Sequence, residues 1–228
     1  MSGIRLFGFS AALLALFAGG QACLRTRRPG AGSVVAEGAL ATLGGLRSIA
    51  AEVVWFRLDR LQAEGRFVEL AQLASALTFL EPHTPEIWCF AAWNMAYNVS
   101  VMLPTPEDRW RWVHAGLRLL RDDGLRLNPD SPEIMRELAT LFEIKIGSGT
   151  DASAPVFRRE WKRIVEDVRA RGAWRELGMD PAEMRRIEAE FGFDDWTDPQ
   201  LSALYWAKRG GLRDIVRQAT ILYRRSHM

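Results

Sequence analysis

The chain has 228 residues, of which 48% are hydrophobic and 25% charged, a balance that is ordinary for a globular protein and excludes wholesale disorder. Its net charge is +2, but four arginines and no acidic residue lie within the first 28 positions, so the remainder has 26 basic against 28 acidic residues. That remainder lacks the excess of Lys and Arg needed to neutralise phosphates, and we therefore expect no nucleic-acid partner.

The first predicted element is residues 6–24, an uncharged and mostly apolar run of 19 residues. As a helix with a rise of ~1.5 Å per residue it would be about 28 Å long, close to the ~30 Å hydrocarbon core of a bilayer. We expect a retained single-pass anchor, residues 1–28, that places the protein in a bacterial inner membrane. The side on which the body lies stays open, because Arg5 precedes the span while Arg25, Arg27 and Arg28 follow it.

Three other interpretations of this segment remain. A cleaved secretory signal is opposed by the arginines directly after the apolar run. A lipoprotein signal would use Cys23 as the lipidated residue, but it lacks the usual leucine three positions earlier. A prepilin-type cleavage after Gly8 would need an acidic residue where Leu13 stands. Cys89, the second cysteine, lies in a helix-like run, so no internal disulfide is expected.

Residues 29–46 are predicted to link the anchor to the body, since they begin with the small, flexible stretch PGAGS. Within them, residues 34–46 are rich in alanine and glycine, and an alternative for them is a second, weakly apolar helix that is too short and glycine-broken to cross a membrane. The body, residues 47–228, has apolar residues at spacings of three and four and no alternating strand pattern. We therefore predict an all-α body. The expected helices cover residues 47–64, 67–80, 86–101, 109–128, 132–146, 156–176, 181–191, 200–208 and 212–225.

One segment of the body occurs twice. Leu80–Trp88 (LEPHTPEIW) recurs 47 residues downstream as Leu127–Met135 (LNPDSPEIM). In each copy a hydroxyl residue, Thr84 or Ser131, suits the N-cap of a helix. The proline and the glutamate that follow it suit the first helical turn. Each copy therefore predicts the end of one helix, a turn and the start of the next.

Helix pairs that end in Leu-x-Pro and restart at a capped Pro-Glu resemble tetratricopeptide (TPR) repeats. In that family a bulky residue, often Trp, opens the first helix, a small residue follows one turn later, and Pro closes the repeat. Trp88, Ala92 and Met95 match the opening of one unit, and Leu127 and Pro129 match its end. Further matches are Trp55, Leu77, Leu80 and Pro82 in an earlier unit and residues 202–207 in a later one.

The resemblance implies a short solenoid of stacked antiparallel helix pairs, preceded by one transmembrane helix. Its clearest repeats would be residues 47–146, with an irregular insert at 148–197 and a last helix pair at 198–226. Two features depart from the family. The period is 47 residues, where the family has about 34, and the insert fits no repeat.

The nine tryptophans are the first residues to suspect of function. Large aromatic side chains commonly pack between neighbouring repeats. The functional hypothesis is instead an aromatic-lined concave face that holds a partner peptide, with arginines at its rim and amide and phenol groups that bond the peptide backbone. The candidate partner-binding residues are Trp88, Asn94, Tyr97, Asn98, Arg109, Arg111 and Trp112.

No catalytic or metal-binding pattern is present in the sequence. The histidines, His83, His114 and His227, lack ligand spacing, and neither cysteine belongs to a CxxC motif. The loop GSGTDASAP at 147–155 lacks the lysine of a phosphate-binding loop, and no Gly-x-Ser-x-Gly motif occurs. We therefore expect no enzyme, no cofactor and no metal.

These features predict a membrane-anchored, TPR-like scaffold or adaptor, an accessory subunit of a bacterial membrane complex whose partners are other proteins. Residues 6–24 would supply the membrane contact. The alternative is a permanent structural subunit of a larger assembly or filament, with its tryptophan-rich faces buried in fixed interfaces. Neither the partner nor the process served can be named from the sequence.

Overall fold

The structure is a computed structural model that describes residues 34–227, with side chains from Ile49 onward except that of Ser75. Its contacts divide the chain into two compact units, Met1–Gly45 and Leu46–Met228. The expected anchor at 6–24 and Cys23 lie outside the described residues. Among the helices that are described, none combines the length and the apolar character needed to cross a bilayer.

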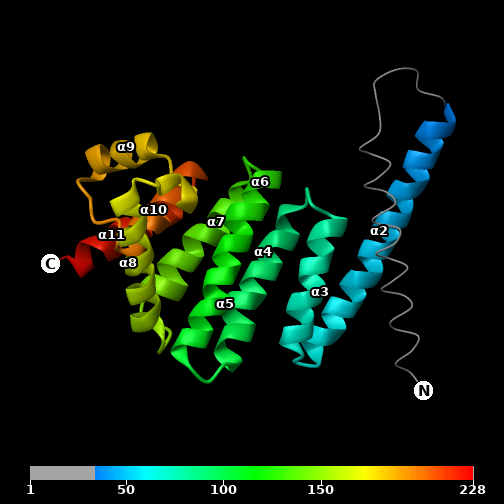
Figure 1. The fold of residues 1–228 in the computed structure, drawn as a ribbon, viewed down its shortest axis with the longest axis horizontal. Coiled ribbons are helices and arrows are strands. Elements are labelled where there is room, and N and C mark those ends of the chain that lie inside the picture. Colours follow the sequence, from blue (N-terminus) through cyan, green and yellow to red (C-terminus); the bar gives the residue numbers. More distant parts are fainter. Residues whose placement is uncertain (1–33, 228) are drawn as a thin grey trace. The chain divides into compact units, whose positions relative to one another are not determined.

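The described residues are helical and contain no strand, so the all-α prediction is confirmed (Figure 1). The α-helices are α2 Val34–Ala63, α3 Phe67–Leu80, α4 Pro85–Trp93, α5 Pro106–Arg118, α6 Leu125–Leu127, α7 Pro132–Thr140, α8 Ala154–Arg171, α9 Pro181–Phe191, α10 Pro199–Arg209 and α11 Arg213–Ser226. Three π-helical segments continue α4, α5 and α7, namely η1 Asn94–Val99, η3 Leu119–Gly124 and η4 Leu141–Gly147. Two short 3₁₀ helices are η2 Ser100–Met102 and η5 Trp174–Leu177.

The helices begin where their capping residues stand. Thr105, Ser131, Asp180 and Asp198 each accept a hydrogen bond from a backbone N–H in the first turn of the helix that follows, and each is followed by proline. Thr84 occupies the N-cap of α4, but its side chain makes no capping hydrogen bond. The capping role expected of both copies of the repeated segment is therefore observed only in the second.

Two segments differ from their expected structure. α2 begins at Val34, inside the stretch 29–46 expected as a linker, in agreement with the alternative of a helix at 34–46; its alanines and leucines favour helix despite three glycines. The helix expected at 156–176 ends earlier, at Arg171, because Gly172 adopts a left-handed conformation with φ of 62° and caps it. The remainder of that stretch forms η5. The insert at 148–197 thus contains α8, η5 and α9.

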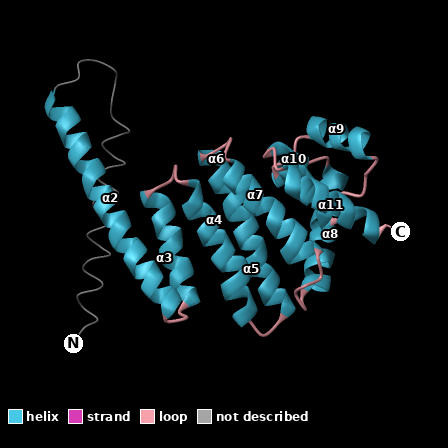
Figure 2. Ribbon diagram, turned by 180° about the vertical axis from the view of Figure 1, so that it is seen from behind, coloured by secondary structure: helices cyan, strands magenta, loops and turns pink. Residues whose placement is uncertain are grey.

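The two copies of the repeated segment lie side by side. α3, α4, α5 and α7 run alternately in opposite directions, and the turns that hold the two copies are at the same ends of their helices (Figures 1 and 2). Asn128 Nδ2 of the second copy donates a hydrogen bond to the carbonyl oxygen of Pro82 in the first, at 2.9 Å. His83 Nδ1 lies 3.2 Å from the carbonyl oxygen of Leu127. The copies therefore contact each other directly, turn against turn.

The apolar core of Leu46–Met228 has two parts. The smaller lies among α2, α3 and α4, and the larger extends from α4 to α11. α4 belongs to both, since Ile87 and Ala91 face the first part while Trp88 and Ala92 face the second. α10 lies deepest, with residues 199–207 all buried against α7, η4 and α11.

Candidate functional site

Two of the seven predicted partner-binding residues are buried. Trp88 is 4% exposed, and its indole N–H donates to the carbonyl oxygen of Pro82 at 3.0 Å. Asn94 is fully buried, and its amide donates to the carbonyl oxygen of Phe67 at 3.2 Å. Trp88 is thus bonded to the turn that precedes α4, and Asn94 joins η1 to α3. Neither side chain reaches a partner from solvent in this arrangement.

Tyr97 and Asn98 are half-buried on η1. Asn98 Nδ2 donates to Asn94 Oδ1 at 2.9 Å, and the Tyr97 ring stacks on Trp93, with ring centroids 5.9 Å apart. Trp93 is 39% exposed, although no pattern in the sequence distinguished it from the neighbouring tryptophans. Burial, and secondarily the charges of Glu137 and Glu143, raise the pKa of Tyr97 well above its usual range. The phenol therefore stays protonated and available as a hydrogen-bond donor.

The other three candidates lie on α5, which packs against η1. Arg109 holds the preceding turn, because its Nε donates to the carbonyl oxygen of Leu103 at 2.8 Å. Arg111 is exposed and pairs with Asp108 at 2.7 Å. Trp112 is half-buried. The seven residues thus divide between the packing of the helices and the accessible surface.

A buried ion pair joins η4 to the loop that follows it. Lys145 Nζ lies 2.6 Å from Asp151 Oδ2, and the two side chains are 5% and 11% exposed. The ammonium group also lies 5.1 Å from the centre of the Tyr97 ring. Burial alone would raise the pKa of Asp151, but hydrogen bonds from Lys145 and from the backbone N–H of Ser153 hold it below its usual range. In the sequence, a lysine within the mostly apolar segment LFEIKIG was the one feature that could have indicated a buried ion pair here.

Glu137 on α7 is a half-buried acid without such compensation. Its Oε1 is buried and has no hydrogen-bond partner, and burial raises its pKa to about 7. Cys89 lies on the neighbouring α4. Burial, and to a smaller extent the charges of Glu137 and Glu133, raises the pKa of its thiol to about 12. This thiol is therefore protonated at neutral pH and is a poor nucleophile.

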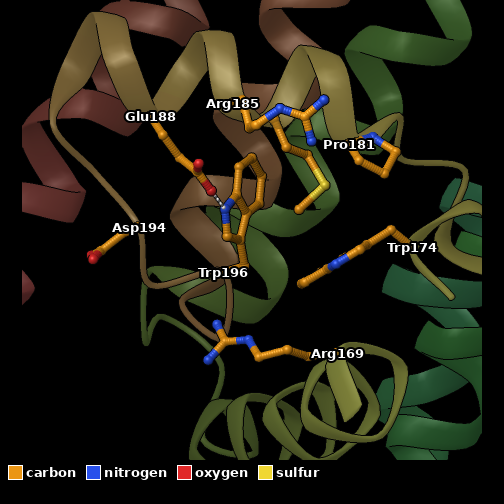
Figure 3. A pocket seen from close by; sticks show the side chains of 8 residues that line it. Arg169, Trp174, Pro181, Arg185, Glu188, Asp194 and Trp196 are labelled. Atoms are coloured by element: carbon orange, nitrogen blue, oxygen red, sulfur yellow. Dashed lines mark hydrogen bonds between the residues drawn. The ribbon is translucent and has the colours of Figure 1, made fainter. Parts of the chain in front are cut away.

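The insert forms an open cavity of about 290 Å³ between α8, η5, α9 and the loop that follows α9 (Figure 3). Trp174 and Trp196 meet edge to face within it, with centroids 6.3 Å apart, and the Trp196 indole donates to Glu188 Oε1 at 2.6 Å. Arg169 and Arg185 line the cavity without an ion pair to any described residue. No motif in the sequence predicted a role for this region.

Metal binding has no support in the described part of the chain, where no three His, Cys, Asp or Glu side chains gather as a metal site would require. Comparison with known proteins likewise identifies no relative: no family model, no curated protein and no solved structure matches this chain.

Proposed function

We propose that this protein is a TPR-like scaffold that binds other proteins and is held at a membrane by residues 6–24. The observation that carries the proposal is the direct stacking of the two copies of the repeated segment, joined by the hydrogen bond from Asn128 to Pro82. Repeat proteins stack similar units in this way and use the continuous surface that results to bind partners. A tether would raise the local concentration of membrane-associated partners. The proposed role is that of an accessory subunit of a bacterial membrane complex.

The surface that best fits a partner is the η1 surface, which we define as Trp93, Tyr97 and Asn98. Trp93 and Tyr97 form a stacked aromatic pair, and Trp93 is 39% exposed. Such rings supply a large contact area with little loss of side-chain entropy on binding. The amide of Asn98 and the phenol of Tyr97 add polar groups that can bond a partner's backbone. Asn94 is buried next to this surface and accepts a hydrogen bond from Asn98 Nδ2 at 2.9 Å.

One observation favours the alternative, a permanent structural subunit. On α2, Ile49, Val53 and Phe56 recur at spacings of four and three, and they are 60%, 59% and 76% exposed. An exposed apolar stripe of this kind is typical of a surface that is covered in an assembly. The stripe and the η1 surface are on different helices, so one experiment can separate the two functions.

The experiment is affinity capture of the tagged full-length protein from its host in mild detergent, read by mass spectrometry. The wild type is compared with Trp93→Ala and Phe56→Ala. A scaffold predicts partners that are lost from the Trp93→Ala variant and retained by Phe56→Ala. A structural subunit predicts stoichiometric, wash-resistant partners that are lost from Phe56→Ala and retained by Trp93→Ala. If the wild type captures nothing, both functions are refuted.

A further inference from the structure

A groove with a volume of about 640 Å³ lies between α11, the end of α10 and the end of α9. Four basic residues line it: Lys208, Arg213, Arg217 and Arg224. No acidic residue does. We call it the basic groove. It shares no residue with the η1 surface or with the cavity of Figure 3, although α9 contributes to both the groove and the cavity.

This region is positively charged, whereas the chain after residue 28 has slightly more acidic than basic residues. From Lys208 to Arg225 there are six basic residues and one acidic residue, Asp214. Asp214 is engaged elsewhere, since Arg136 of α7 pairs with it at 3.0 Å. Lys208 is neutralised by Glu190 at 2.7 Å. The groove therefore depends on its arginines for net charge.

The three arginines of the groove have no ion pair with any described residue. Arg213, Arg217 and Arg224 are separated by four and seven residues, so they follow one face of α11. A guanidinium group presents its N–H donors in a fixed fork that matches a carboxylate. Arg224 also lies over the ring of Phe193, with its guanidinium carbon 5.8 Å from the ring centre. The three guanidinium groups, none with an ion pair to a described residue, thus form a row of sites for acidic side chains along one helix face.

Apolar side chains lie between these charges. Val216 and Phe191 are half-buried in the groove, and Ile221 is 40% exposed. The residues that α11 turns toward the core, Ile215, Ala219 and Tyr223, are buried. A ligand that fills the groove would therefore need apolar groups as well as negative charge.

We propose that the basic groove binds an acidic amphipathic segment of a partner protein. Its carboxylates would pair with Arg213, Arg217 and Arg224, and its apolar side chains would cover Val216 and Ile221. This inference rests on the proposed function and specifies the chemistry of one partner. An anionic membrane fits less well, because a helix at a bilayer inserts a broad apolar face, whereas Ile221 is the one large exposed apolar side chain on α11.

The test uses the full-length protein in detergent micelles and a fluorescent synthetic peptide with Glu and Leu at helical spacing. A second peptide replaces every Glu with Gln and keeps every Leu. We expect the acidic peptide to bind more tightly and to lose affinity as salt is added. The variant Arg213→Glu/Arg217→Glu should raise the dissociation constant of the acidic peptide by about tenfold or more.

The matched control is Arg175→Glu/Arg185→Glu, which makes the same change in net charge at two exposed arginines outside the groove. It should leave the dissociation constant within about twofold, since distant surface charges are largely screened. If the groove variant unfolds at a lower temperature than the wild type, the milder Arg217→Gln replaces it, and a several-fold loss of affinity is still expected.

Three results would overturn the inference. The first is equal affinity for the acidic and the neutral peptide. The second is an unchanged dissociation constant of the acidic peptide for the groove variant. The third is arginine-dependent binding to vesicles that contain phosphatidylserine, without binding to the peptide. Host capture separates this failure from that of the proposed function. If the groove variant still captures the host partners and the wild type does not bind the peptide, the groove proposal is refuted and the proposed scaffold function is retained. If the wild type captures no host protein, the proposed scaffold function is refuted, whether or not the peptide binds.

Discussion

Glu137 has one carboxyl oxygen buried at the contact between α4 and α7, without a hydrogen-bond partner, and its pKa is raised to about 7. The unfolded chain ionises this group near its ordinary value of 4.5. Below pH 4.5 both states hold the proton and folding carries no penalty. Between pH 4.5 and 7 the unfolded state gives up its proton first, so stability falls as the pH rises, and above pH 7 the penalty is constant.

Glu137→Gln should therefore stabilise the protein at pH 8, by on the order of 2 kcal/mol, and leave its stability nearly unchanged at pH 4. The measurement is denaturant unfolding of the full-length protein in detergent, followed by tryptophan fluorescence at both pH values. Glu86→Gln, at an exposed position on α4, is the control and should have little effect at either pH. A Glu137→Gln variant that is less stable at pH 8 would show that the carboxylate is stabilised by a partner.

Cys89 provides an independent probe of the same contact. Because its pKa is raised to about 12, its thiolate is scarce at neutral pH and its burial limits access by reagents. In a Cys23→Ser background, alkylation by iodoacetamide at pH 7.5 should be about a hundredfold slower for the native protein than for the denatured chain. Mass spectrometry measures both rates. Equal rates would mean that α4 and α7 separate readily in solution.

At the scale of elements, the pair Lys145–Asp151 fastens η4 to the loop that leads into α8. Lys145→Met removes the cation and leaves Asp151 buried without its partner, so we expect a loss of about 3–5 kcal/mol in the free energy of unfolding. Lys145→Met/Asp151→Asn should recover part of that loss, because no charge is then buried. Both values come from denaturant unfolding under the conditions used for Glu137.

Lys162→Met is the matched control for this prediction. Lys162 and Glu166 on α8 are 3.8 Å apart, and both side chains are more than half exposed. An exposed pair of this kind contributes at most about 1 kcal/mol, so the same Lys-to-Met change should cost little. Similar losses at both lysines would indicate that Lys145 contributes through its side-chain packing and not through its charge.

At the scale of the whole molecule, the division of the core predicts how Leu46–Met228 unfolds. Leu77 lies in the part of the core formed by α2, α3 and α4, and Leu204 lies in the part that extends to α11. In a stack of units each contacts its neighbours alone, so a local loss of stability stays local. Leu77→Ala should reduce hydrogen-exchange protection in α3 and the adjoining half of α2 and leave α10 protected. Leu204→Ala should do the reverse.

Hydrogen exchange read by mass spectrometry measures both variants on the full-length protein. Each substitution removes a fully buried side chain and should cost about 2–5 kcal/mol, so the two variants are matched in severity. Protection lost uniformly along the chain in both variants would mean a single cooperative unit. That outcome would count against a repeat-like organisation.

The sequence by itself determined the helices and most of their ends. Apolar spacings of three and four residues identify a helix from its own residues, and the caps at Ser131, Asp180 and Asp198 act on the backbone two or three positions away. Both signals are local, so no knowledge of the neighbouring helices is needed. The left-handed glycine at Gly172 is also local, yet the charged run around it concealed the end of α8.

Only the tertiary structure decided which side chains a partner can reach. Helical spacing placed Trp88 and Asn94 on a candidate binding face, but α4 and η1 are covered there by other helices. The unpaired arginines of the basic groove were equally hidden in the sequence, because Asp214 stands beside Arg213 and yet pairs with Arg136 of α7. Spacing along a helix assigns a residue to a face. What covers that face, and which charges remain unpaired, depends on contacts between residues far apart in the chain.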